Sequence, residues 1–363
     1  MKLISERIKS FRNIKEAVFR PSPAVTVICG ENGQGKTNLL ESVFMLTGAK
    51  SFRHAKDREL PDKYGTGNSL IEAEFFAEGR QQEIKLSIGS KGRYASVNRG
   101  TERKASEAAG KFCCVVFSPE HLDLVKGTPA ERRRFIDTAL CQLSSAYMAS
   151  LREYTRLLAQ KNALLKDARN ISAAFDMLDV YDESMAASAS VLISYRKRFA
   201  SLLEREAGEA YSSVSGGREQ LGISYIGSAG EDEDRDAVMR MMISSRSDDI
   251  RMGYSTVGPH RDDLELRLDG DPARVYGSQG QQRTAVLALK LAEASIFRSK
   301  LGEEPVLLLD DVLSELDLSR QEFLLKRIGQ SQAVITCCES NFVERQTDAD
   351  VWKMDHGVLS RLS

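Results

Sequence analysis

Residues 30–37 read GENGQGKT, which fits the spacing G-x-x-x-x-G-K-[ST] of a phosphate-binding loop. Glycines at these positions let backbone N–H groups turn toward an anion, and the helix that starts near Lys36 directs its positive dipole end at the same charge. We expect Lys36 to act as a catalytic cation on the β- and γ-phosphates of ATP, and the Thr37 hydroxyl to bind Mg²⁺. The residues expected to contact the nucleotide here are Gly30, Glu31, Asn32, Gly33, Gln34, Gly35, Lys36, Thr37 and Asn38.

A second candidate segment, residues 305–311, reads PVLLLDD, an apolar strand that ends in two carboxylates. In P-loop ATPases such a strand lies beside the phosphate loop and its first acid holds Mg²⁺, so Asp310 is the expected metal residue. Asp311 is the expected catalytic residue that polarises the attacking water. Because Asp is one methylene shorter than the Glu usual at this position, the sequence predicts slow intrinsic hydrolysis.

The third segment, residues 276–283, reads YGSQGQQR and precedes a predicted helix. It resembles the signature of ABC ATPases, in which a serine hydroxyl and backbone N–H groups at a helix start bind the γ-phosphate held by the opposite subunit. Ser278, Gly280 and Gln281 are therefore expected to contact nucleotide across a dimer. Residues 314–317, SELD, match the D-loop of the same class.

The composition of the 363 residues is that of an ordinary globular chain, with 42% hydrophobic and 28% charged residues. The formal net charge is -1, so nucleic-acid binding requires local basic patches or a surface formed by dimerisation. The six cysteines show no C-x-x-C pair and indicate free thiols in a reducing compartment. No signal peptide and no apolar run of roughly 20 residues is present, so we expect a soluble, cytoplasmic protein without a membrane partner.

The pattern along the chain predicts an α/β fold. Strands are expected within 2–29 and 69–98, several helices within 131–209, and a polar, acidic loop at 228–236. Strands return near 264–268, 305–309 and 333–336, with a helix at 282–300 and a hairpin turn at 355–357. We therefore predict an ABC/SMC-head-like P-loop NTPase with mixed sheets and an inserted, mainly helical lobe, without a long coiled coil. Residues 1–118 and 300–363 would form the ATP-binding lobe, and 119–299 a second lobe carrying the signature.

Several longer segments make the resemblance more specific. Residues 274–284 (RVYGSQGQQRT), 258–264 (GPHRDDL) and 309–317 (LDDVLSELD) resemble the RecF family of SMC-like ATPases. Further matching segments are 287–293, 117–120, 124–127, 132–137 and 51–53. Arg12 and Asn13 resemble the nucleotide-contacting N-loop of SMC-like heads.

The resemblance implies a DNA repair and replication protein, a recombination mediator with an SMC-type head but no long arms. It implies a weak, DNA-stimulated ATPase that dimerises with ATP and binds double-stranded DNA at gaps and single-strand junctions. It also implies cooperation with RecR and RecO in loading RecA, and a part in the SOS response.

Other interpretations remain open in the sequence. One is another arm-less SMC-like ATPase, and another is the nucleotide-binding subunit of a membrane transporter, although that class usually carries L-S-G-G-Q and a clear Q-loop glutamine. Cys337 stands where many ABC ATPases have a histidine. Two basic stretches, 132–134 and 93–104, are candidates for DNA phosphate or for solvated surface. His260 is expected to have a structural role in a Gly-Pro turn, or to relay to the nucleotide site, rather than to act as a base.

Overall fold

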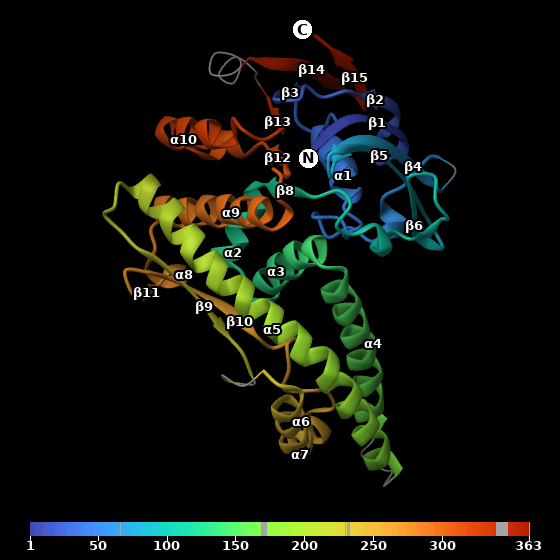
Figure 1. Ribbon diagram of the computed structural model, residues 1–363, viewed down its shortest axis with the longest axis vertical. Coiled ribbons are helices and arrows are strands. Elements are labelled where there is room, and N and C mark those ends of the chain that lie inside the picture. Colours follow the sequence, from blue (N-terminus) through green and yellow to red (C-terminus); the bar gives the residue numbers. More distant parts are fainter. Residues whose placement is uncertain (66, 168–172, 229, 231–232, 339–347, 363) are drawn as a thin grey trace.

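The computed structural model describes residues 1–363 except 66, 168–172, 229, 231–232, 339–347 and 363. Two six-stranded sheets lie together at one end of the molecule, and a mainly helical part extends away from them (Figure 1). Strands come from both ends of the chain and most helices from its middle, as the sequence predicts.

The first sheet has the order β15-β14-β3-β13-β12-β8, and its strands are parallel except in the β14–β15 hairpin. Its central strands are continuous apolar runs because they are buried on both faces. Parallel strands end at the same edge, so the segments after β3, β12 and β13 meet there. The strands are β3 (Val25–Cys29), β8 (Cys114–Phe117), β12 (Val306–Asp310), β13 (Ala333–Cys337), β14 (Ala349–Asp355) and β15 (Val358–Arg361).

The second sheet is antiparallel, with the order β2-β1-β4-β5-β6-β7. Ile84, Leu86 and Ile88 alternate with polar residues on β5 and are all buried, which confirms the predicted alternation. Helix α1 (Lys36–Met45) packs against β1 of this sheet and against β12 and β13 of the other. The strands are β1 (Lys2–Phe11), β2 (Ile14–Phe19), β4 (Ser69–Ala77), β5 (Arg80–Gly89), β6 (Gly92–Val97) and β7 (Arg103–Lys104).

The helical part is built on α4 (Ser145–Asp167) and α5 (Ala173–Ser215), which lie side by side (Figure 1). At 23 and 43 residues they form a short hairpin rather than a long arm. A small sheet, β11-β10-β9, flanks them. The other elements of this part are η3 (Pro119–Leu122), α2 (Asp123–Lys126), α3 (Pro129–Leu143), β9 (Leu221–Ile226), α6 (Arg235–Ser244), α7 (Arg246–Met252), β10 (Asp263–Leu268), β11 (Asp271–Pro272), α8 (Ala273–Tyr276) and α9 (Gln279–Leu301).

Short elements complete the sheet end: η1 (Asp57–Glu59), η2 (Ala105–Ala108), η5 (Val312–Glu315) and α10 (Leu318–Ile328). The predicted lobe boundaries fall between β8 and η3 and within the last turn of α9, and the division into two lobes stays a prediction. Of the predicted acidic loop, residues 229, 231 and 232 lie outside the described residues. None of the described helices combines the length and the apolar character that crossing a bilayer requires.

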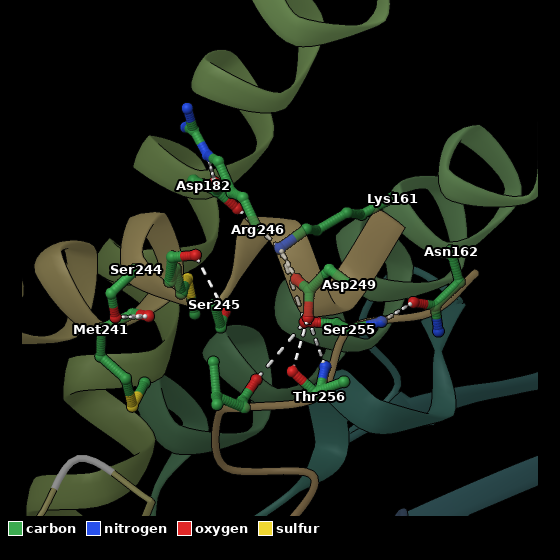
Figure 2. A network of polar contacts seen from close by, with 12 residues as sticks. Lys161, Asn162, Asp182, Met241, Ser244, Ser245, Arg246, Asp249, Ser255 and Thr256 are labelled. Atoms are coloured by element: carbon green, nitrogen blue, oxygen red, sulfur yellow. Dashed lines mark hydrogen bonds and ion pairs between the residues drawn. The ribbon is translucent and has the colours of Figure 1, made fainter. Parts of the chain in front are cut away.

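A buried ionic network holds the far end of the helical part together (Figure 2). The Lys161 ammonium on α4 lies 2.8 Å from Asp182 of α5 and 2.9 Å from Asp249 of α7, and all three side chains are fully buried. Arg246 donates to Asp182 at 2.7 Å. Asp249 also accepts from the backbone N–H and hydroxyl of Thr256. Each buried charge is thus paired, which burial in a low-dielectric interior requires.

His260 lies next to this network and is held through both ring nitrogens. Its Nδ1 accepts from the Tyr154 hydroxyl at 2.7 Å, and its Nε2–H donates to the Ser255 carbonyl at 3.0 Å, the pairing that a neutral ring permits. Burial lowers the pKa of His260 to about 4, so the ring stays neutral near pH 7. Gly258 has a φ of +122°, and a Cβ there would lie 2.5 Å from the Tyr154 hydroxyl. The Gly-Pro-His turn therefore packs closely against Tyr154.

Replacing Lys161 with Met tests the buried network. The change leaves Asp182 and Asp249 with less compensation in a dry interior, so we expect a loss of about 3–5 kcal/mol in the free energy of unfolding. Urea denaturation measures it. Arg156→Ala, which removes an exposed pair with Glu153, is the control and should change little. Equal losses in both variants would contradict the assignment.

A second buried charge lies under α1. Glu6 of β1 is fully buried, and no described residue gives its carboxyl a hydrogen bond short enough to count as one. Burial raises its pKa from 4.5 to about 8, against the smaller opposing effect of Ser42. A raised carboxyl pKa means that folding takes up a proton, so this contribution to stability is complete below about pH 4.5 and is lost as the pH rises toward 8.

Glu6→Gln should therefore flatten the pH dependence of stability. Between about pH 5 and pH 8 the wild-type protein should lose up to about 1.4 kcal/mol per pH unit from this group, and the variant should not. Denaturation curves at several pH values measure the difference. Glu16→Gln, on the exposed face of β2, is the control. Parallel pH profiles for Glu6→Gln and wild type would refute the assignment.

Candidate nucleotide-binding site

The glycine loop between β3 and α1 is shaped by two close backbone approaches. Gly30 has a φ of +153°, and a Cβ there would lie 2.4 Å from the Met354 carbonyl oxygen. Gly35 has a φ of +115°, and its Cβ would lie 2.6 Å from the Asn13 side chain. Only glycine fits both positions. The loop is therefore held between the β1–β2 turn and the β14–β15 hairpin.

Lys36 begins α1 and folds back over the loop. Its ammonium donates to the carbonyls of Gly30 at 2.6 Å and Glu31 at 2.9 Å, and the residue is only 6% exposed. No described carboxylate pairs with it. A buried cation held by neutral carbonyls at a helix N-terminus is suited to exchange them for phosphate oxygens.

Three segments remote in sequence meet at the buried carboxylate of Asp310. Its Oδ1 accepts from the Thr37 hydroxyl at 2.7 Å and from the Thr336 hydroxyl at 2.9 Å. Burial raises the pKa of Asp310, and the two hydrogen bonds oppose that shift. A hydroxyl and a carboxylate are the hard oxygen donors that Mg²⁺ takes, together with water and phosphate. The predicted metal residues Thr37 and Asp310 are thus adjacent, and they fit such an ion.

Asp311, the predicted catalytic residue, follows in a left-handed conformation with a φ of +52°. Its backbone N–H donates to the Thr336 hydroxyl at 3.0 Å, and its carbonyl accepts from Ser314 of the D-loop at 2.7 Å. The strand end is thereby fixed on both sides. The role of Asp311 as base stays a prediction.

Of the predicted N-loop pair, Asn13 lies on the phosphate loop and Arg12 beneath it. The Asn13 amide donates to the Gln34 carbonyl at 2.9 Å and its oxygen accepts from Asn38 at 2.8 Å. Arg12 makes two hydrogen bonds of 2.9 Å to the Glu41 carboxylate. Asn13 thus contacts the phosphate loop and Arg12 contacts Glu41 of α1, and the expected contact of both residues with nucleotide stays a prediction.

Two residues of the site were missed by sequence reasoning. Glu41 is fully buried and collects Arg12, Ser51 and Arg53 under the phosphate loop. The sequence offered one signal for Glu41, which is a carboxylate within the apolar stretch of the helix that follows the phosphate loop. The Thr336 hydroxyl links the carboxylate of Asp310, the last residue of β12, to the backbone N–H of Asp311, and only the sheet order reveals this.

The end of β13 lies beside the phosphate loop. Cys337 is buried, and Cys338, which follows β13, has its sulfur 4.0 Å from the Lys36 ammonium and 3.4 Å from the Asn32 oxygen. Cys338 therefore contacts the loop in this structure, and the correspondence of Cys337 to the histidine of other ABC ATPases stays a prediction.

The two basic stretches are mostly engaged within the protein. Arg132 is 7% exposed and makes two hydrogen bonds to Asp263 at 2.7 and 2.8 Å. Arg93 pairs with Asp57 at 3.0 Å and donates to the Ala49 carbonyl. Arg132 and Arg93 are therefore held by intramolecular pairs, and contact of the remaining cations of the two stretches with DNA phosphate stays a prediction.

The signature segment forms the exposed start of α9. Ser278 is the N-cap: its hydroxyl accepts from the Gln281 N–H at 3.3 Å, and the Gln281 side chain accepts from the Ser278 N–H at 2.7 Å. Arg320 next to the D-loop approaches the Gly280 carbonyl at 3.4 Å. Figure 1 shows α8, directly before Ser278, well separated from α1. One copy therefore does not bring Ser278 to its own phosphate loop.

A phosphate loop, a buried metal-type carboxylate and a serine-capped helix, arranged on these sheets, define an ATPase head of the ABC type. The sequence profile described as "RecF/RecN/SMC N terminal domain" matches residues 2–359. A "DNA replication and repair protein RecF" of Acetivibrio thermocellus is 38% identical over 350 residues, covering 94% of this chain and 95% of the relative. One of Agathobacter rectalis with the same name is 38% identical over 362 residues, covering 99% and 98%. The chain belongs to the RecF family.

Solved structures agree with this. One described as "Structure of the recombination mediator protein RecF-ATP in RecFOR pathway" has a TM-score of 0.91 at 31% identity, covering 100% of this chain and 98% of that one. An Smc head domain from Pyrococcus furiosus has a TM-score of 0.55 at 17% identity, covering 100% and 97%, and shows the fold alone. The predicted fold class is confirmed, and the transporter alternative is set aside.

Thr336→Val tests the junction at Asp310. The change keeps the side-chain volume but removes the hydroxyl that both acidic residues use, so nucleotide turnover should fall about 10- to 100-fold. Nucleotide affinity should change little because Lys36 and the loop are untouched. A fluorescent nucleotide analogue measures affinity, and phosphate release measures turnover. Thr336→Ser is the control and should retain most turnover; unchanged turnover in Thr336→Val would exclude this role.

Proposed function

We propose that the protein is an ATP-dependent, DNA-binding ATPase of recombinational repair that dimerises around ATP. The observation that carries this is the separation of the glycine loop from Ser278 within one chain. A nucleotide held by Lys36 has an open γ-phosphate side, and a second copy can close it with the exposed N-terminus of α9. Two such sites form when two copies pair head to tail.

In this proposal the chain's own residues have distinct tasks. The loop N–H groups and Lys36 bind phosphate, and Thr37 with Asp310 would hold Mg²⁺, which supplies charge neutralisation at the phosphates. Asp311 orients the attacking water. Turnover is slow without DNA because the Asp side chain is short, which suits a switch better than a motor. Residues 1–118 with 300–363, and 119–299, act as the two lobes.

Names of relatives and neighbours support the cellular role. They read "DNA replication and repair protein" and place a recombination mediator with bound ATP in the "RecFOR pathway". We propose that this chain likewise binds gapped and junction DNA in the cytoplasm, as part of the response to DNA damage. RecR and RecO would be its partners in loading RecA.

Ser278→Arg tests the composite site. The added side chain meets the partner's γ-phosphate region, so ATP-driven dimerisation should be lost while nucleotide binding by one copy is kept. Lys36→Ala should instead lose most nucleotide affinity, because it removes the phosphate-binding cation. Light scattering with and without ATP measures association, and Ser201→Arg on the exposed face of α5 is the control.

The proposed stimulation of ATP turnover by DNA is measured in the same samples. Wild-type turnover should be slow alone and rise with gapped duplex, and it should stay slow in Ser278→Arg. A Ser278→Arg protein that still dimerises with ATP contradicts the composite site. Failure of gapped duplex to bind or to stimulate the dimer contradicts the DNA role.

A further inference from the structure

A large cleft lies away from the phosphate loop, between the sheet end and the helical part. It has a volume of about 1080 Å³ and is bounded by β6, η2 and the segment after α1 on one side and by α3 and α4 on the other. In Figure 1, α3 and α4 lie below β6 and α1. Ser278 and the phosphate loop residues 30–37 are not part of its lining.

The floor of the cleft is apolar. Phe44 and Phe135 are buried there, and Phe52, Met148 and Leu151 are half-buried and still face open volume. Phe44 and Phe52 pack edge to face with ring centroids 5.5 Å apart, which fixes that part of the floor. A concave apolar surface of this size can bury side chains of a ligand.

Four exposed cations that line the cleft have no ion pair with any residue that the structure describes: Lys50, Lys91, Lys104 and Arg152. Other cations of the lining are neutralised, as in the Arg134–Glu131 and Lys290–Glu293 pairs. The uncompensated positive charge is therefore concentrated on four side chains, from both sides of the opening.

A fifth cation, Arg133, lies deeper and is half-buried. Its guanidinium donates to the Asp262 backbone carbonyl at 2.7 Å, and no described carboxylate pairs with it. The nearby Asp263 carboxylate is taken by Arg132. Burial lowers the pKa of Arg133 most, followed by the charge of Arg196, and Asp263, Asp137 and Asp262 oppose the shift. Because the Arg133 guanidinium donates to a neutral carbonyl, it can still pair with an incoming anion.

The lining of the cleft also holds carboxylates. Asp57, Glu131, Asp137 and Glu293 are each ion-paired with an arginine or a lysine, whereas Glu120 and Asp123 have no ion pair within the described residues. A nucleic-acid strand carries charge at every phosphate and would meet Glu120 and Asp123, whereas a peptide can place its few carboxylates opposite the cations only. The apolar floor also suits peptide side chains better than a phosphate backbone.

We propose that this cleft docks an acidic peptide segment of a partner protein, with aromatic or aliphatic anchors on the Phe52–Leu151 floor and carboxylates on Lys91, Lys104, Arg133 and Arg152. The binding is separate from nucleotide-driven dimerisation, because the cleft shares no lining residue with the phosphate loop or the signature. It goes beyond the proposed ATPase function and does not depend on it.

Fluorescence anisotropy of a labelled peptide, Asp-Asp-Phe-Glu-Asp-Leu-Asp-Glu, tests the proposal on the full chain. Saturable binding that weakens with salt is expected, and the peptide with every acid replaced by its amide should not bind. A photoreactive group at the Phe position should cross-link to residues of β6, α3 or α4. Absence of saturable binding would overturn the proposal.

Charge reversal tests whether the cations of the cleft bind the peptide, because the same number of cations can be reversed elsewhere as a control. The cleft variant combines Lys91→Glu, Lys104→Glu and Arg152→Glu. The control variant combines Lys2→Glu, Lys15→Glu and Lys300→Glu, which are equally exposed, unpaired cations elsewhere. Peptide affinity should fall at least about tenfold in the cleft variant and stay near wild type in the control.

Other readouts separate this idea from the proposed function. The cleft variant should keep ATP-driven dimerisation and gapped-duplex binding. Replacing Leu151 with Glu should also weaken the peptide, because it charges the apolar floor. Equal loss in the control, or loss of duplex binding with peptide binding intact, would overturn the proposal and make the cleft a nucleic-acid surface.

Discussion

The buried carboxylate of Asp310 is the contact on which the site depends. It accepts hydrogen bonds from Thr37 and Thr336, and so ties α1, β12 and β13 into one edge of the parallel sheet. Thr336 then holds the Asp311 backbone, which continues into the D-loop. Because a buried charge is costly unless its hydrogen bonds are satisfied, the sheet cannot shift without disturbing the phosphate loop.

Two other sets of buried ionic groups also have their charges satisfied by a partner. Lys161 with its two aspartates, and Arg132 with Asp263, are buried and paired, and they join segments of the helical part. The cleft between the sheet end and the helical part is different, since several of its cations have no partner within the described chain. Paired charges here fix the fold, and unpaired ones mark surface available to a ligand.

The position of the signature is the basis for the proposed dependence on a second copy. Ser278 is satisfied locally as a helix N-cap, yet the N-terminus of α9 remains exposed and far from α1. A local capping box thus leaves an exposed helix N-terminus that the same chain does not bring to its own phosphate loop. In the proposed dimer ATP would be a shared ligand, and its binding would be coupled to association.

The sequence alone determined the order of strands and helices, the glycine loop, the acidic strand and the capped helix at Ser278. Each depends on local rules: positive φ at glycine, apolar runs and capping spacing. Tertiary structure alone decided which charged side chains have no ion-pair partner among the described residues. Arg132 finds Asp263, 131 positions away, and Arg12 finds Glu41, whereas Arg133 finds no carboxylate. Availability of a charge depends on which distant segment packs against it, and no local spacing encodes that distance.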